Sequence, residues 1–195
     1  MKKNLNAADP ITTEVVRGLL DSAVEEVQQV LYKVSHSPLI TDARDSTSAL
    51  FDAQGRTIAQ ATAVPCHLGC LHDLGRIFAK EFNKSAKDGD IYIHNDPYNG
   101  GTHLPDLAIV SPVILKNKLV GYVATMSHHA DIGGFAPGSV NFAASDLYAE
   151  GLILSMATLI KAGKVNHALF ETILANSRVP HSLKGDLGGQ IAACL

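Results

Sequence analysis

Apolar side chains recur every three or four positions over residues 12–36 of the chain. This spacing places them on one face of a helix, which Asp9 and Pro10 would start and Pro38 would stop. Charged and amide side chains occupy the opposite face, as is typical of a solvated surface. The pattern therefore predicts a long N-terminal helix with one buried face.

Shorter apolar runs predict the strands of a sheet. Two runs within residues 46–60 flank a turn that contains Gly55, and the runs 107–115 and 119–126 flank a polar turn. Each pair predicts a β-hairpin, and the run 91–94 predicts a further strand. Helical spacing predicts helices over about 68–82 and over 166–176, although Gly69 and Gly75 disfavour the first. The run 152–160 fits either a strand or a helix.

The end of the chain, residues 186–195, has the pattern of a helix that is just beginning, without a cap or a polar tail. We therefore expect a fragment, or a chain that a separate chain continues. Together the elements predict an α+β fold, in which a mixed or antiparallel sheet with hairpins packs against the long N-terminal helix and further helices, as part of a larger fold. No repeat or linker divides the chain, so residues 1–195 are expected to form a single domain.

Composition narrows the class of protein. The chain has 195 residues, of which 46% are hydrophobic and 18% charged, and a formal net charge of −3. The apolar content suffices for a core, and the charge balance argues against nucleic acid as a partner. No apolar run approaches the ~18 residues of a membrane helix, no signal peptide opens the chain, and three cysteines cannot all pair. We expect a cytoplasmic protein without membrane contacts.

Two glycine-rich loops follow predicted strands and concentrate histidines and aspartates. The first loop contains His103 and Asp106, and the second contains the adjacent His128 and His129. Imidazole and carboxylate groups together bind several divalent metals. Because adjacent residues at the end of a strand point in opposite directions, only one of His128 and His129 would join the first two as a ligand.

Other residues could extend this candidate site. Asp45 precedes a predicted strand and could bring another carboxylate to the same place. A two-histidine, one-carboxylate set leaves positions open to water or substrate, which predicts hydrolytic or electrophilic chemistry. Asp131 and Glu150 are candidate acid–base residues, although loop capping or surface exposure explains them equally well. The chain has no P-loop for ATP and no Gly-x-Ser-x-Gly motif.

At these residues the chain resembles the hydantoinase B subunits, a family related to 5-oxoprolinase and to the large subunits of acetone and acetophenone carboxylases. The most specific matches are Asn95-Asp96-Pro97-Tyr98, Gly100-Gly101-Thr102-His103-Leu104-Pro105-Asp106 and His128-His129-Ala130-Asp131-Ile132-Gly133-Gly134. Further matches, spread in order over the whole chain, are Asp9-Pro10-Ile11-Thr12, Arg44-Asp45, Ala49-Leu50-Phe51-Asp52, His67-Leu68-Gly69, Pro137-Gly138-Ser139, Glu150-Gly151, Leu174-Ala175-Asn176, Asp186-Leu187 and Gln190-Ile191-Ala192-Ala193.

The resemblance implies roles for individual residues. The metal ligands would be His103, Asp106 and His128, joined by Asp45 in the members that open lactams. His129 and Asp131 would support the ligands or handle protons, and together with the acid–base candidate Glu150 they are the expected catalytic residues. The ion would be zinc, manganese or iron.

The resemblance also implies partners. A hydantoinase A-like subunit would bind the ATP, a further chain would supply the missing C-terminal part, and apolar surface would be exposed where that chain docks. The expected function of this hetero-oligomer is ATP-dependent opening of a cyclic amide or imide of the hydantoin, N-methylhydantoin, 5-oxoproline or lactam type. The alternatives are a subunit of a ketone carboxylase and a non-catalytic piece that completes an interface.

Overall fold

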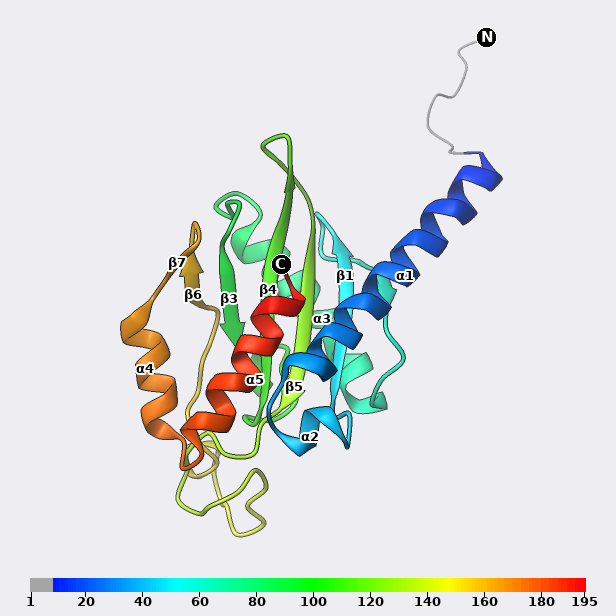
Figure 1. Ribbon diagram of the computed structural model, residues 1–195. Helices are drawn as coiled ribbons and strands as arrows, with labels where there is room; N and C mark the ends of the chain where they lie inside the picture. The colour runs from blue at the N-terminus through cyan, green and yellow to red at the C-terminus, as the bar shows by residue number, and fades with distance from the viewer. Residues whose placement is uncertain (1–8) are drawn as a thin grey trace.

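A computed structural model describes residues 9–195, except for the side chains of Cys66 and Leu68 (Figure 1). The helices are α1 (Pro10–Val34), α2 (Pro38–Thr41), α3 (Pro65–Phe82), α4 (His167–Asn176) and α5 (Pro180–Ala193), with short 3-10 helices η1 (Pro97–Asn99) and η2 (Leu147–Ala149). The strands are β1 (Ser46–Asp52), β2 (Thr57–Gln60), β3 (Ile91–His94), β4 (Asp106–Leu115), β5 (Lys118–His128), β6 (Ala157–Lys161) and β7 (Lys164–Val165).

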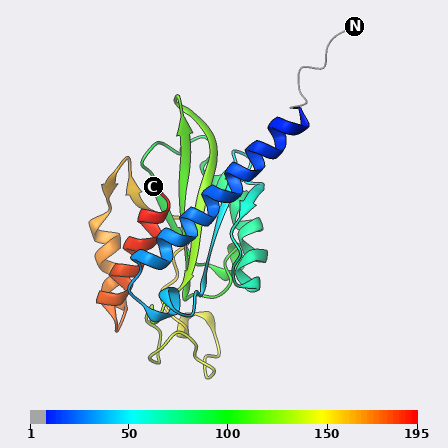
Figure 2. The same cartoon turned by 45° about the vertical axis from the view of Figure 1, so that its right-hand side comes forward.

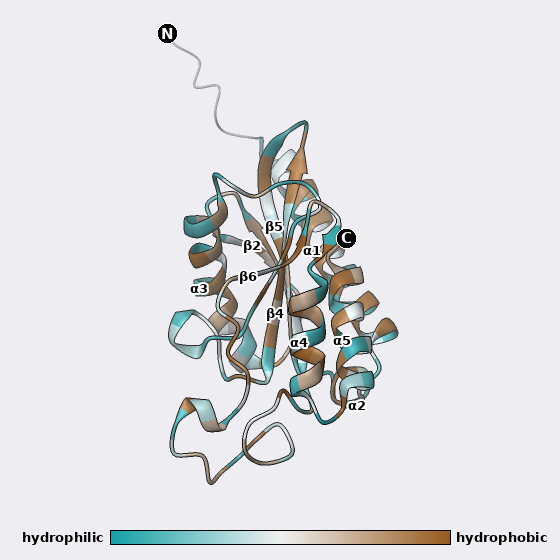
Figure 3. Ribbon diagram, turned by 90° about the vertical axis from the view of Figure 1, so that its left-hand side faces the viewer, coloured by the Kyte–Doolittle hydropathy of each residue, from teal (hydrophilic) through white to brown (hydrophobic). Residues whose placement is uncertain are grey.

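The strands form one sheet of seven in the order β2-β1-β5-β4-β3-β6-β7, and each neighbouring pair is antiparallel. The helix α3 covers one face, and α1, α4 and α5 cover the other (Figure 3). Successive residues of β4 show this division, since Leu107 and Ile109 pack in one core and Ala108 and Val110 in the other. The structure confirms the predicted α+β class and shows a wholly antiparallel sheet.

The two predicted hairpins are confirmed as β1–β2 and β4–β5. The helix predicted despite Gly69 and Gly75 is α3. Of the ambiguous run 152–160, only the end is regular, because β6 begins at Ala157. These elements follow the sequence pattern closely, because their apolar spacing matches the faces that they bury.

The prediction for the end of the chain was right about the presence of a helix and wrong about where that helix begins. Residues 186–193 are not the start of a helix but the last turns of α5, which begins at Pro180 and ends at Ala193. Its first turns were missed because they contain a single buried apolar side chain, Leu183, and therefore carry no periodic signal.

The first helix is only partly packed against the sheet. Asp9 caps it by accepting hydrogen bonds from the backbone N–H groups of Ile11 and Thr12. Its C-terminal half packs against α5, β1 and β2, where Val24 and Leu31 are buried. Its N-terminal half projects beyond the sheet (Figures 1 and 2). In the described part of the chain, no helix is both long and apolar enough to cross a membrane.

Candidate metal centre

Three chain segments that carry candidate ligands meet at one end of the sheet. Asp106 opens β4 and lies directly opposite His128, the last residue of β5. Asp45 immediately precedes β1, and its carbonyl oxygen accepts a hydrogen bond of 3.0 Å from the backbone N–H of His128. Strand pairing therefore sets the relative positions of residues that lie far apart in the sequence.

Asp106 is the centre of this cluster, with only 1% of its surface exposed. One carboxylate oxygen lies 2.7 Å from Nδ1 of His103 and 3.1 Å from Nε2 of His67. The other lies 3.0 Å from Nδ1 of His128. The hydroxyl of Thr102 also donates to this carboxylate. Three imidazole nitrogens thus converge on one buried anion.

These contacts set the charge states of the cluster. Burial alone would raise the pKa of Asp106, but hydrogen bonds from His103, His128 and His67 hold that pKa far below its ordinary value. The hydrogen bond with Asp106 raises the pKa of His103 against the opposing effect of burial, and the negative charges of Glu150 and Asp45 raise it further. Asp106 is therefore held ionised, and its negative charge attracts protons or a cation.

The donor set fits a divalent metal ion. His103, Asp106 and His128 each offer a ligand atom, and these atoms all lie within 4.8 Å of one another. The rings of His103 and His128 stack with centroids 4.8 Å apart. The cluster lines an open cavity of about 380 Å³, whose wall also includes Asp45. Mixed imidazole and carboxylate ligands beside open space would suit zinc, manganese or iron.

His67 is a member of the cluster that sequence reasoning did not single out. It lies in the first turn of α3, its side chain is 2% exposed, and its Nε2 is also 3.9 Å from a carboxylate oxygen of Asp45. Its Nδ1 has no hydrogen-bond partner among the described residues. The available signal was its place in the matching stretch His67-Leu68-Gly69, which lies between Asp45 and the loop that carries His103 and Asp106.

The structure places two of the predicted catalytic residues away from this cavity. His129 is buried on the opposite face of the sheet, where its Nε2 lies 3.0 Å from the side-chain oxygen of Gln190. Burial lowers the pKa of His129. Asp131 accepts 2.9 Å hydrogen bonds from the backbone N–H of Gly133 and from the guanidinium of Arg178. The observed contacts of His129 and Asp131 connect these two residues to neighbouring segments of the chain.

Glu150, the third predicted catalytic residue, influences the cluster through its charge. It follows η2 and is half-buried, and its charge contributes to the raised pKa of His103. Within the described residues it is not part of the cavity wall. The cavity thus brings together the four predicted metal ligands, whereas the three predicted catalytic residues do not line it.

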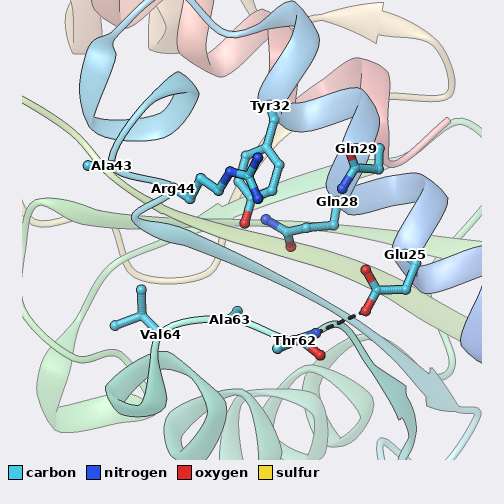
Figure 4. A pocket seen from close by; sticks show the side chains of 9 residues that line it. All are labelled: Glu25, Gln28, Gln29, Tyr32, Ala43, Arg44, Thr62, Ala63 and Val64. Atoms are coloured by element: carbon cyan, nitrogen blue, oxygen red, sulfur yellow. Dashed lines mark hydrogen bonds between the residues drawn. The ribbon is translucent and has the colours of Figure 1, made fainter.

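A second cavity, of about 470 Å³, adjoins the first (Figure 4). It lies between α1 and the segment that leads into α3, where Glu25 accepts a 3.0 Å hydrogen bond from the backbone N–H of Thr62. The guanidinium of Arg44 lies over the ring of Tyr32, 5.3 Å from its centroid. Arg44 and Asp45 line different cavities and Val64 lines both, so the two spaces share a wall.

The fold and the cluster define a class, namely an α+β protein with a candidate divalent-metal centre at one end of an antiparallel sheet. The sequence pattern of the family described as Hydantoinase B/oxoprolinase matches residues 9–195. The chain belongs to this family.

Individual relatives agree with this assignment. Caprolactamase subunit beta from Pseudomonas jessenii is 36% identical over 190 residues, which are 97% of this chain and 33% of that protein. The 5-oxoprolinase of Dictyostelium discoideum is 32% identical over 185 residues, which are 95% of this chain and 15% of that protein. The chain thus spans a third or less of the length of these relatives.

Solved structures share the fold. The crystal structure of ATP-dependent caprolactamase from Pseudomonas jessenii matches with a TM-score of 0.90 and 36% identity, over 97% of this chain and 33% of that one. A nucleotide-free acetone carboxylase matches with a TM-score of 0.88 over 95% of this chain and 25% of that one. At 21% identity, the second likeness shows the fold alone.

Proposed function

We propose that the chain is the N-terminal portion of a metal-dependent subunit of an ATP-dependent amidohydrolase, which opens a cyclic amide or imide. The observation that carries this proposal is the convergence of His103 and His128 on the buried carboxylate of Asp106 beside an open cavity. Relatives named caprolactamase and 5-oxoprolinase support the substrate class, since caprolactam and 5-oxoproline are cyclic amides.

Each residue of the cluster has a proposed task. His103, Asp106, His128 and Asp45 would hold the divalent ion. Such an ion supplies Lewis acidity and makes a water molecule more acidic. His67 holds Asp106 from the side of α3, and Thr102 holds it from the loop, so that the carboxylate keeps one orientation. The open side of the cavity would admit the ring of the substrate next to the cluster.

ATP would be bound by a partner subunit of the hydantoinase A type. The chain itself contains no P-loop sequence. The caprolactamase structure is named as ATP-dependent, and the caprolactamase relative from the same organism is named as a subunit, beta. Phosphorylation of an oxygen of the substrate by the partner would make an otherwise unfavourable ring opening proceed. The complex would work in the cytoplasm, where ATP is available.

The polypeptide that corresponds to the remaining length of the relatives, termed the companion, would pack against this portion and complete the fold. Caprolactamase subunit beta is about three times as long as the matched part, since the chain covers 33% of it. The projecting half of α1 exposes three apolar side chains on one helical face: Ile11 is 78% exposed, Val15 58% and Leu19 65%. Such a stripe is unfavourable in water and typical of a surface that another chain covers.

A ketone carboxylase subunit is the second candidate function, and the shared fold with acetone carboxylase is the observation that favours it. The same four residues would then bind the ion. The higher identity with the caprolactamase, 36% against 21%, favours the amidohydrolase.

The test is a reaction assay on the chain reconstituted with its A-type partner and its companion chain. Caprolactam, hydantoin and 5-oxoproline would be offered with ATP, and acetone with bicarbonate and ATP would be offered separately. We expect ring opening coupled to ATP hydrolysis, and its loss in the His103→Ala/His128→Ala protein. Carboxylation of acetone without ring opening would favour the second candidate, and activity of the double variant equal to wild type would contradict both.

A further inference from the structure

Two buried polar side chains of α5, Asp186 and Gln190, lie one helical turn apart and therefore on one face. They are 1% and 0% exposed. Burying a carboxylate or an amide is costly unless its polar atoms are hydrogen-bonded. Figure 1 shows α5 lying across the middle strands of the sheet, on the face away from α3. The partners of Asp186 and Gln190 explain why polar groups occupy this position.

Asp186 holds the segment that delivers Asp45. One of its carboxylate oxygens accepts hydrogen bonds from the backbone N–H groups of His36, at 2.7 Å, and Ser37, at 2.8 Å. Ser37 is the residue before α2, and within α2 the carbonyl oxygen of Leu39 accepts a 2.8 Å hydrogen bond from the backbone N–H of Asp45. Asp186 thus anchors the short helix against which Asp45 is placed.

Gln190 holds the two strands that deliver the other ligands. Its side-chain N–H donates to the carbonyl oxygen of Leu107, at 2.9 Å, and Leu107 follows Asp106 directly. Its side-chain oxygen lies 3.0 Å from Nε2 of His129, the residue after His128. One amide therefore bridges β4 and the end of β5 immediately behind the candidate metal ligands.

The two side chains form a network of contacts that is joined at His129 by an electrostatic approach and not by a hydrogen bond. Nδ1 of His129 lies 3.9 Å from the second carboxylate oxygen of Asp186, and the carbonyl oxygen of Asp45 accepts the backbone N–H of His128. The network reaches the backbone next to Asp45, Asp106 and His128 from the opposite face of the sheet. We infer that Asp186 and Gln190 are positioning residues, which set the relative placement of these three ligands without contacting the cavity. This inference deepens the proposed function and rests on it for the metal.

The experiment compares Gln190→Met and Asp186→Ala with wild type. Asp186→Asn retains an acceptor for the two backbone N–H groups and should recover part of any loss. Gln190→Glu retains an acceptor for His129 but loses the N–H that donates to Leu107, so it should not recover the loss. Leu187→Ala is the matched control, because Leu187 is 0% exposed on the same helix but packs only in the apolar core. Two quantities are measured on the full chain, namely the dissociation constant for Mn²⁺ and the hydrogen exchange of backbone amides without metal.

We expect Gln190→Met and Asp186→Ala to weaken Mn²⁺ binding about 10–100-fold, as is usual when groups that orient ligands are removed. Leu187→Ala should lower the melting temperature and leave the affinity unchanged. Without metal, the His128 and Asp45 amides should exchange faster in the two variants, relative to amides of the β3–β4 core. Affinities equal to wild type, or an equal loss in Leu187→Ala, would overturn the inference.

The two proposals can fail separately. If the wild-type chain binds no Mn²⁺, the proposed function fails, but the amide exchange still decides whether Asp186 and Gln190 hold the three segments. Unchanged relative exchange at His128 and Asp45 would overturn the positioning role. If Asp186→Ala does not fold, Asp186→Asn and the Gln190 pair carry the same comparison.

Discussion

The carboxylate of Asp106 shows how the candidate centre depends on single residues. A buried, ionised carboxylate is tolerated only where enough donors surround it, and Asp106 has donors from three imidazoles and one hydroxyl. Residue types and loop positions predicted His103, Asp45 and one of His128 and His129 near it, and the family resemblance favoured His128. His67 could not be predicted from spacing, because a helix in the tertiary fold brings it to the cluster.

Asp131 is a carboxylate that connects neighbouring segments by hydrogen bonds and is not one of the proposed metal ligands. Its contribution to stability can be tested. Burial alone would raise its pKa, but hydrogen bonds from Gly133 and Arg178 lower that pKa below the ordinary value of 3.8. A lowered folded-state pKa means that this stabilisation is present above the unfolded pKa and is lost as the pH falls through the folded pKa. We expect Asp131→Asn to lower the free energy of unfolding at neutral pH by about 1–3 kcal/mol.

Urea unfolding over a range of pH checks this prediction. The difference between wild type and Asp131→Asn should stay constant at neutral pH and shrink once the pH falls below 3.8. Asp21→Asn, on the exposed face of α1, is the control and should change little at any pH. A difference that does not vary with pH would show that the charge of Asp131 is not the cause.

At the scale of elements, a close approach between α3 and the β1–β2 hairpin explains one of the glycines that disfavoured the predicted helix. A Cβ atom at Gly75 would lie 2.7 Å from the carbonyl oxygen of Gly55 and would meet the ring of Phe51. At Gly69, in the same helix, no atom lies within 4 Å of an added Cβ. The close approach of the hairpin therefore requires a glycine at position 75 but not at position 69.

Alanine substitutions distinguish them. Gly75→Ala should destabilise the protein by about 1–3 kcal/mol, because the hairpin has to move away from the helix. Gly69→Ala should be neutral or stabilising by up to about 1 kcal/mol, because alanine favours the helical state. Thermal unfolding of both variants measures the difference. Equal effects at the two positions would contradict the described packing of α3.

Most elements could be predicted from the sequence, and the exceptions have physical reasons. The strands β4 and β5 carry long β-branched runs, and α1 and α3 carry apolar side chains at helical spacing. The start of the helix α5 was predicted too late, because its first turns contain a single buried apolar side chain, Leu183. Asp186 and Gln190 are also buried on this helix, and their partners lie in distant segments that the pattern does not reveal. Patterns of hydrophobicity report burial against apolar partners, and they do not report polar groups that are buried in hydrogen bonds.

At the scale of the whole molecule, the exposed stripe of α1 tests the proposed companion chain. We expect Ile11→Gln/Val15→Gln/Leu19→Gln to keep the melting temperature, because the three side chains are 78%, 58% and 65% exposed. Binding to the companion should fall at least about 100-fold, since each buried apolar side chain contributes roughly 1.5–3 kcal/mol.

Titration calorimetry with the companion chain measures this loss. Arg17→Gln/Asp21→Gln changes exposed charged positions on the same half of α1 and is the control, which should bind as wild type does. Undiminished binding of the triple variant would place the companion on another surface.

The central claim is that His103, Asp106 and His128 bind a divalent ion, and elemental analysis of the purified full chain tests it most directly. We predict about one equivalent of zinc, manganese or iron per chain in wild type, and none in the His103→Ala/His128→Ala protein, because two imidazole ligands are gone. His72→Ala/His181→Ala, which changes two exposed histidines, should retain the ion. Circular dichroism confirms that each variant is folded. Full retention of metal by a folded His103→Ala/His128→Ala protein would contradict the account.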